Sequence, residues 1–344
     1  MARVPDVEGF LTLSASIHYQ LSGTPPNWDA ILALVLEEQV PPAERDLLVA
    51  TLDFLREAYG ETRRKLGPNA ILHPIRVLAL LRRDGAELTP RIVVTTLLHD
   101  LREDVTPERS SDRWEQLDEG YRTLMGRLDP AEAEAVDEQI AVMTRQAGEK
   151  YYEYLGRLLH RAADDPDLVP IKLADRLDNT LDLRLDLQDE AASLDAPRAL
   201  FDLLFTDNDW PVGWEDHPVP GKFNGSHRLY QLFKNAVFLS MVRKEGMDQR
   251  SGPARRLSHD LALASVDEAE RNLLHLFTYH VTDPADRRRL VTDVMAYCQS
   301  GAISRVTPAA SPHALDGLFD TRLDRPTKAS LLRELDHEIG RAHV

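Results

Sequence analysis

The segment TPRIVVTTLLHDLREDV, residues 89–105, combines a strong helical pattern with a cluster of ionisable side chains. Thr89 followed by Pro90 is typical of a helix start, because threonine caps the first turn and proline fits within it. Residues 92–98 are all apolar or β-branched, which predicts a helix that is buried on most sides and runs through Leu101. The polar residues that follow this run are His99, Asp100, Glu103 and Asp104. On a continuous helix these four side chains share one face.

Three carboxylates on one face of a buried helix repel each other, so they need a cation or must lose their charge. A divalent metal ion supplies such a cation, and histidine beside aspartate is a ligand pair that suits it. Because one helix offers too few ligands, we expect others on neighbouring helices. His73 in ILHPIRVLAL and Asp175 in IKLADRLDNTLDLR are the candidates. Taken singly, His73 is typical of a helix start or core position, and Asp175 of an ion-pair partner for Arg176 or Arg184.

Helical periodicity dominates the rest of the chain, and the alternation typical of strands is hard to find. The predicted helices are 28–38, 43–58, 73–83, 89–101, 131–144, 150–163, 170–187, 228–244, 265–281 and 284–299. We therefore predict an all-α fold with a helical extension at 1–42, a compact helical domain at 43–195 and a helical accessory region at 196–344. The accessory region is either a separate domain or an extension packed on the first. A stretch rich in proline, glycine and tryptophan, starting at Phe205, predicts a long ordered loop.

Composition narrows the class of protein. The chain has 344 residues and is 43% hydrophobic, which is enough for a sizeable core. Its formal charge of −16 is spread along the sequence, which argues against nucleic acid or an acidic membrane as the main partner. The single cysteine, Cys298, excludes a disulfide framework and a thiolate metal cluster, so a metal must be held by histidine and carboxylate. No leader or membrane-spanning pattern is present, so we expect a soluble cytoplasmic protein.

Two motifs together carry a resemblance to a known family. LLHDLREDV and IKLADRLDN are similar to the HD superfamily of metal-dependent phosphohydrolases, and most similar to the hydrolase domain of the RelA/SpoT-type alarmone enzymes and small alarmone hydrolases. In that family HDxxED and LADRxxN recur together, and an Arg-Lys pair stands nine residues before the first ligand histidine. Here Arg64 and Lys65 precede His73 at that spacing. The resemblance covers about residues 45–190.

The resemblance implies a fold, a cofactor and an activity. The fold would be the helical bundle of an HD domain. Its implied metal ligands, for one Mn²⁺ ion, are His73, His99, Asp100 and Asp175. Glu103 and Asp104 would orient and activate the attacking water, and the residues implied to contact the nucleotide are Arg64, Lys65 and Asn179. The implied reaction removes pyrophosphate from the 3′ position of ppGpp or pppGpp to give GDP or GTP.

Two alternatives remain open at this point. The same metal site can serve a phosphohydrolase for another nucleotide, such as an adenine alarmone or a nucleoside mono- or triphosphate. The fold can also act as a regulatory module that senses a nucleotide without turnover. Neither the oligomeric state nor any protein partner is indicated by the sequence.

The chain also departs from the family pattern. Leu66 replaces a serine, Ala70 replaces a tyrosine, and Asp178 stands where LADRLHN has histidine. We expect these positions to shape the nucleoside pocket rather than the metal site. A second His-Asp pair, His259 and Asp260, has no Glu-Asp pair after it, and we expect it on a solvated helix face. Nothing after residue 195 resembles the synthetase domain of the long family members.

Overall fold

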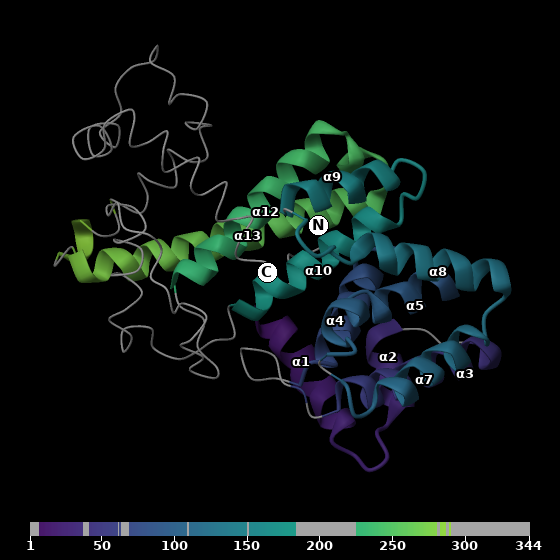
Figure 1. Ribbon diagram of the computed structural model, residues 1–344. Coiled ribbons are helices and arrows are strands. Elements are labelled where there is room, and N and C mark those ends of the chain that lie inside the picture. Colours follow the sequence, from purple (N-terminus) through teal and green to yellow (C-terminus); the bar gives the residue numbers. More distant parts are fainter. Residues whose placement is uncertain are drawn as a thin grey trace. The chain divides into compact units, whose positions relative to one another are not determined.

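The computed structural model describes residues 7–36, 41–60, 62, 69–108, 110–149, 151–183, 225–280, 283–286 and 289. Every regular element in these residues is a helix, with no strand among them, so the all-α prediction is confirmed (Figure 1). The arrangement is consistent with the helical bundle of an HD domain. The chain divides into two compact units, and the described part of the first consists of residues up to 183 together with Phe233–Ala264. The predicted boundary at 195 lies outside the described residues.

The helices of the first unit are α1 (Val7–Leu21), α2 (Trp28–Leu36), α3 (Pro42–Tyr59), α4 (Leu72–Arg83), α5 (Pro90–Leu98), α6 (Leu101–Asp104), α7 (Trp114–Met125), α8 (Pro130–Met143), α9 (Tyr151–Arg161) and α10 (Leu168–Leu183). Those that the sequence predicted individually agree with the prediction to within a few residues at their ends. Helices α1, α6 and α7 were not predicted as separate helices. Two longer helices, α12 (Gly225–Lys244) and α13 (Gly252–His280), belong partly to each unit. Helix α13 begins well before the predicted start at 265.

Helix α4 lies at the centre of the first unit. Its residues from Leu72 to Leu81 are all buried, because α1, α2, α5 and α10 pack around it. The neighbouring helices contribute apolar side chains to the same core, among them Ile17, Ile31, Leu55, Val94 and Leu97. Polar side chains on α4, or on the face of α10 that contacts it, are therefore enclosed by protein, and such groups need partners.

Helix α5 starts as predicted and ends earlier. The Thr89 side chain accepts a hydrogen bond from the Ile92 amide at 3.3 Å, and Pro90 occupies the first turn. The helix ends at Leu98, whereas the sequence predicted Leu101. The carbonyl of Thr96, which a continuous helix would use for the amide of residue 100, instead accepts a hydrogen bond from His99 Nδ1 at 2.7 Å.

A turn at His99 and Asp100 follows. Asp100 has φ −94° and ψ −1°, and the short helix α6 starts after it. The amides of Glu103 and Asp104 both donate to the Asp100 carbonyl at 3.0 Å. The prediction that these four polar residues share one continuous helical face is therefore wrong, because the turn separates the His-Asp pair from the Glu-Asp pair.

The segment Phe233–Ala264 contacts α4 and α10 through polar side chains that are buried or partly buried. Asn235 accepts from Arg176 Nε at 2.9 Å and donates to Thr180 Oγ1 at 2.8 Å. Arg83, at the end of α4, pairs with Asp260 of α13 at 2.9 Å. The expectation of a solvated face thus holds for the exposed His259, but it is wrong for Asp260, which is buried with Arg83 as its partner.

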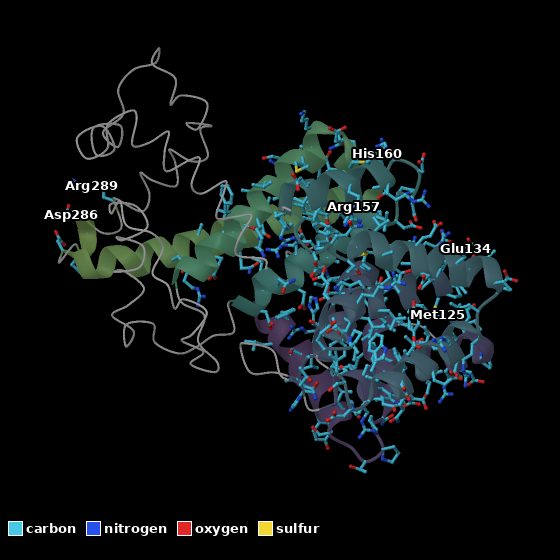
Figure 2. The ribbon with its side chains drawn as sticks, in the orientation of Figure 1. Met125, Glu134, Arg157, His160, Asp286 and Arg289 are labelled. Atoms are coloured by element: carbon cyan, nitrogen blue, oxygen red, sulfur yellow. The ribbon has the colours of Figure 1, made fainter. Side chains whose placement is uncertain are left out.

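The outer faces of the helices carry charged and polar side chains. Glu134 on α8 and His160 on α9 are exposed examples (Figure 2). Among the described helices, none combines the length and the apolar character needed to cross a lipid bilayer. Residues 205–224, which contain the predicted loop, lie outside the described residues. Cys298 also lies outside them.

Candidate metal centre

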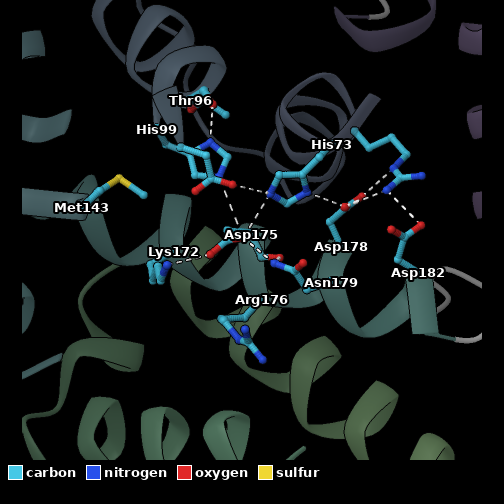
Figure 3. A network of polar contacts seen from close by, with 12 residues as sticks. His73, Thr96, His99, Met143, Lys172, Asp175, Arg176, Asp178, Asn179 and Asp182 are labelled. Atoms are coloured by element: carbon cyan, nitrogen blue, oxygen red, sulfur yellow. Dashed lines mark hydrogen bonds and ion pairs between the residues drawn. The ribbon is translucent and has the colours of Figure 1, made fainter. Parts of the chain in front are cut away.

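Four side chains from three parts of the first unit converge in its core (Figure 3). His73 comes from the first turn of α4, His99 and Asp100 from the turn after α5, and Asp175 from the middle of α10. One nitrogen or oxygen atom of each lies within 4.8 Å of those of the other three. The structure therefore brings together all four residues that the sequence suggested as metal ligands.

The two imidazoles face the two carboxylates through their Nε2 atoms. His73 Nε2 lies 3.2 Å from Asp100 Oδ2 and 3.2 Å from Asp175 Oδ1. His99 Nε2 lies 3.2 Å from Asp100 Oδ1 and 3.8 Å from Asp175 Oδ1. The two ring centroids are 5.1 Å apart. Two nitrogens and two carboxylates thus surround one small volume.

The hydrogen bond of His99 determines which of its nitrogens can bind a metal. Its Nδ1 lies 2.7 Å from the Thr96 carbonyl, which can only accept, so Nδ1 carries the proton. The buried Nε2 then presents a lone pair towards carboxylate oxygens. Two electron-rich groups at 3.2 Å repel each other unless a cation lies between them. A set of two imidazoles and two carboxylates suits a divalent metal ion, so the residues present fit one.

The histidines and aspartates of the cluster shift each other's pKa values, because each group lies next to groups of opposite charge. Burial lowers the pKa of His99, but Asp100 and Asp175 outweigh this effect and raise it well above its usual value. Burial raises the pKa of Asp100, but His99 and His73 outweigh this effect and lower it. The cluster therefore favours positive charge at its centre, which a proton or a metal ion can supply.

Asp175 is held on both sides. Lys172 Nζ lies 2.8 Å from Oδ2, and Asn179 Nδ2 donates to Oδ1 at 2.6 Å and to the main-chain oxygen of Asp175 at 3.0 Å. The Lys172 ammonium also lies 5.3 Å from the centre of the Tyr154 ring. The ion-pair partner of Asp175 is thus Lys172, and not Arg176 as the sequence allowed. A contact between Asn179 and the nucleotide stays a prediction.

Asp178 was expected to shape a nucleoside pocket, and that expectation is wrong. Its Oδ2 lies 2.6 Å from Nδ1 of His73, on the side of the ring opposite to the carboxylate cluster (Figure 3). The sequence contained one signal for this contact. Asp178 follows Asp175 by three positions, so the two lie on the same face of α10.

Glu103 and Asp104, in α6, lie at the rim of the cluster, where both residues remain accessible to solvent and their carboxyls are close enough to Asp100 to be affected by its charge. Glu103 Oε1 accepts from the Arg145 amide at 2.8 Å, and Asp104 Oδ2 accepts from the Tyr59 hydroxyl at 3.1 Å. Partial burial and the charge of Asp100 raise the pKa of both carboxyls. A positioned carboxylate with a raised pKa suits proton transfer near neutral pH.

The predicted substrate contacts Arg64 and Lys65 lie outside the described residues. Their role stays a prediction from the sequence.

The fold and the site define the class: an all-α protein whose core holds a cluster of two histidines and two aspartates that could bind a divalent metal ion. No protein-family model matches the sequence. Over 138 residues the chain is 28% identical to guanosine-3′,5′-bis(diphosphate) 3′-pyrophosphohydrolase of Aquifex aeolicus (strain VF5). The match covers 40% of this chain and 18% of the relative's length. The similarity thus supports a distant relationship to that hydrolase over less than half of the chain.

Proposed function

We propose that this protein is a metal-dependent phosphohydrolase of phosphorylated nucleotides, and that its substrate is ppGpp or pppGpp. The reaction would release pyrophosphate from the 3′ position and leave GDP or GTP. The convergence of His73, His99, Asp100 and Asp175, with two carboxylates at the rim, carries the proposal. The distant similarity to the 3′-pyrophosphohydrolase of Aquifex aeolicus supports the choice of substrate.

The four converging residues would hold the ion, for which we propose Mn²⁺. A bound divalent ion supplies Lewis acidity, which polarises a phosphoryl oxygen and lowers the pKa of water. Glu103, at the rim, takes a proton from the attacking water. Asp104, held by the Tyr59 hydroxyl, orients that water. The water oxygen bonds to phosphorus, the P–O3′ bond breaks, and the 3′ oxygen takes up a proton.

On the substrate side we propose that Arg64, Lys65 and Asn179 contact the nucleotide. The planar guanidinium of arginine can stack on a base or bind phosphate through two bonds, whereas lysine acts as a point charge. Asn179 already lies against Asp175, so a nucleotide that it contacts would also be next to the metal centre.

A panel of nucleotides tests the proposal. The full-length protein with Mn²⁺ is incubated with ppGpp, pppGpp, an adenine alarmone and nucleoside mono- and triphosphates, and the products are separated by ion-exchange chromatography. We expect GDP or GTP with pyrophosphate from the guanosine alarmones, and no products from Asp100→Ala or Asp175→Ala. Failure to turn over any 3′-pyrophosphorylated nucleotide would rule out the proposed substrate. Turnover of another nucleotide, or binding without turnover, would instead support the corresponding alternative.

A further inference from the structure

Behind His73, the facing sides of α4 and α10 carry a second set of charged side chains. His73 and Arg76 are three residues apart on α4, and Asp178 and Asp182 are four apart on α10, so each pair lies on one helical face. The side chains of Arg76 and Asp178 are 0% exposed and that of Asp182 is 2% exposed. Charges buried this deeply are tolerated only when they are paired and hydrogen-bonded.

Asp178 joins His73 to this set. Its Oδ1 accepts from Arg76 Nε at 2.8 Å and its Oδ2 from Arg76 Nη2 at 2.9 Å. Two guanidinium hydrogen bonds favour the ionised carboxylate, which can only accept. His73 Nδ1, 2.6 Å from Oδ2, therefore donates, and the proton of the ring is on Nδ1. Nε2, the atom that faces Asp100 and Asp175, is left with its lone pair.

Arg76 is itself held from several sides. Its Nη2 lies 3.0 Å from Asp182 Oδ1, and its Nη1 donates to Ser14 Oγ at 3.1 Å. The guanidinium carbon also lies 4.8 Å from the centre of the Phe10 ring. Helix α1 thus helps to fix the arginine that holds Asp178. Asp182 pairs with this arginine and not with His73 Nδ1, which Asp178 occupies.

We propose that Asp178 is a positioning residue of the metal centre: a carboxylate held by Arg76 that keeps the His73 proton on Nδ1 and turns Nε2 towards a divalent metal ion. The inference rests on the proposed metal centre and is independent of the nucleotide substrate. Histidine ligands of metals commonly donate their other ring proton to a carboxylate or carbonyl in this way.

Two variants of the full-length protein, Asp178→Asn and Asp182→Asn, separate positioning from stability. Each removes one carboxylate from Arg76, so we expect similar losses of thermal stability. Asparagine at 178 has a single side-chain oxygen. It therefore cannot accept all the hydrogen bonds that the two carboxylate oxygens of Asp178 accept from His73 and Arg76. We expect the Kd for Mn²⁺, measured by titration calorimetry, to rise about 10- to 100-fold in Asp178→Asn. In Asp182→Asn we expect a change of less than about threefold, because that carboxylate pairs with the arginine, whereas His73 Nδ1 is bonded to Asp178.

An equal rise of Kd in both variants, or no rise in Asp178→Asn, would overturn the inference. If Asp178→Asn does not fold, the wild-type protein gives a second test. Imidazole ¹⁵N spectra of the Zn²⁺-loaded protein, assigned with His73→Gln, should show the His73 proton on Nδ1. A proton on Nε2 would overturn the inference. If the wild type binds neither Mn²⁺ nor Zn²⁺, the proposed metal centre fails and this inference fails with it.

Discussion

Glu103 is the carboxylate whose proposed role can be separated most cleanly from metal binding. Glutamine at this position keeps the size and an oxygen that can accept from the Arg145 amide, but it cannot take a proton. We expect Glu103→Gln to lower kcat by about 10²- to 10⁴-fold, with the Kd for Mn²⁺ nearly unchanged. Glu134→Gln, an exposed position on α8, is the matched control and should change neither quantity. Full activity in Glu103→Gln would show that the residue does not activate water.

Tyr59 offers a test through pH. Burial and Asp100 raise the pKa of Asp104, whereas the hydrogen bond from Tyr59 lowers it. Tyr59→Phe removes that hydrogen bond, so the pKa of Asp104 rises further and the carboxylate is ionised only at higher pH. If ionised Asp104 orients the water, the acid limb of kcat/KM against pH should move to higher pH. An unchanged acid limb, with the wild-type fold retained, would argue against this role for Asp104.

Among single residues, the sequence predicted the metal-ligand candidates that are ionisable side chains in otherwise apolar segments. His99 and Asp100 stand out because they follow a run of buried residues, and Asp175 stands out in a similar setting. The link between Asp178 and Arg76 could not be predicted in the same way. A carboxylate or guanidinium on an amphipathic helix is ordinarily exposed, and only the relative rotation of α4 and α10 brings the two together.

Among the elements, the loop between α8 and α9 connects packing to the rim of the site. Arg157 of α9, labelled in Figure 2, donates to the main-chain oxygens of Val142 and Thr144 at 3.0 and 2.9 Å and pairs with Glu149 at 2.8 Å. The same loop carries Arg145, whose amide donates to Glu103. The loop therefore supplies one of the contacts that position that carboxylate.

Arg157→Gln should loosen this loop. We expect the free energy of unfolding to fall by about 1–3 kcal/mol and kcat to fall several-fold, with the Kd for Mn²⁺ unchanged. Arg161→Gln, four residues further along α9, is the control. Its ion pair with Glu138 is largely exposed, so its loss should cost less than about 1 kcal/mol and leave kcat unchanged. Equal effects of the two variants on kcat would show that the loop does not position Glu103.

For α5, the start was easier to predict than the end. Thr89 and Pro90 form a local signal that suffices to start α5. The end at Leu98 has no such signal, because it depends on the His99 ring bonding to the Thr96 carbonyl and on the tertiary contacts that orient the ring. Helix α7 was not predicted, since its two buried positions, Leu117 and Leu124, stand among polar residues.

For the whole molecule, the sequence left open whether the region after 195 packs on the first part. The structure places Phe233–Ala264 in the same unit as the metal centre, with Asn235 bonded to Arg176, the residue next to Asp175. Such contacts join residues far apart in the chain. They leave no local pattern in the sequence, unlike the apolar periodicity that predicted α12 itself.

The metal centre joins segments that are far apart in the sequence, so an ion bound there should stabilise the first unit. A ligand that binds only the folded state adds RT ln(1 + [L]/Kd), or about 2.7 kcal/mol at 100 times Kd. We therefore expect Mn²⁺ at that concentration to raise the midpoint of thermal unfolding by about 5–10 °C, and EDTA to reverse the rise. Asp100→Ala removes one ligand from the turn after α5 and should abolish the shift in calorimetric scans. An equal shift in Asp100→Ala and in the wild type would place the stabilising ion elsewhere in the protein.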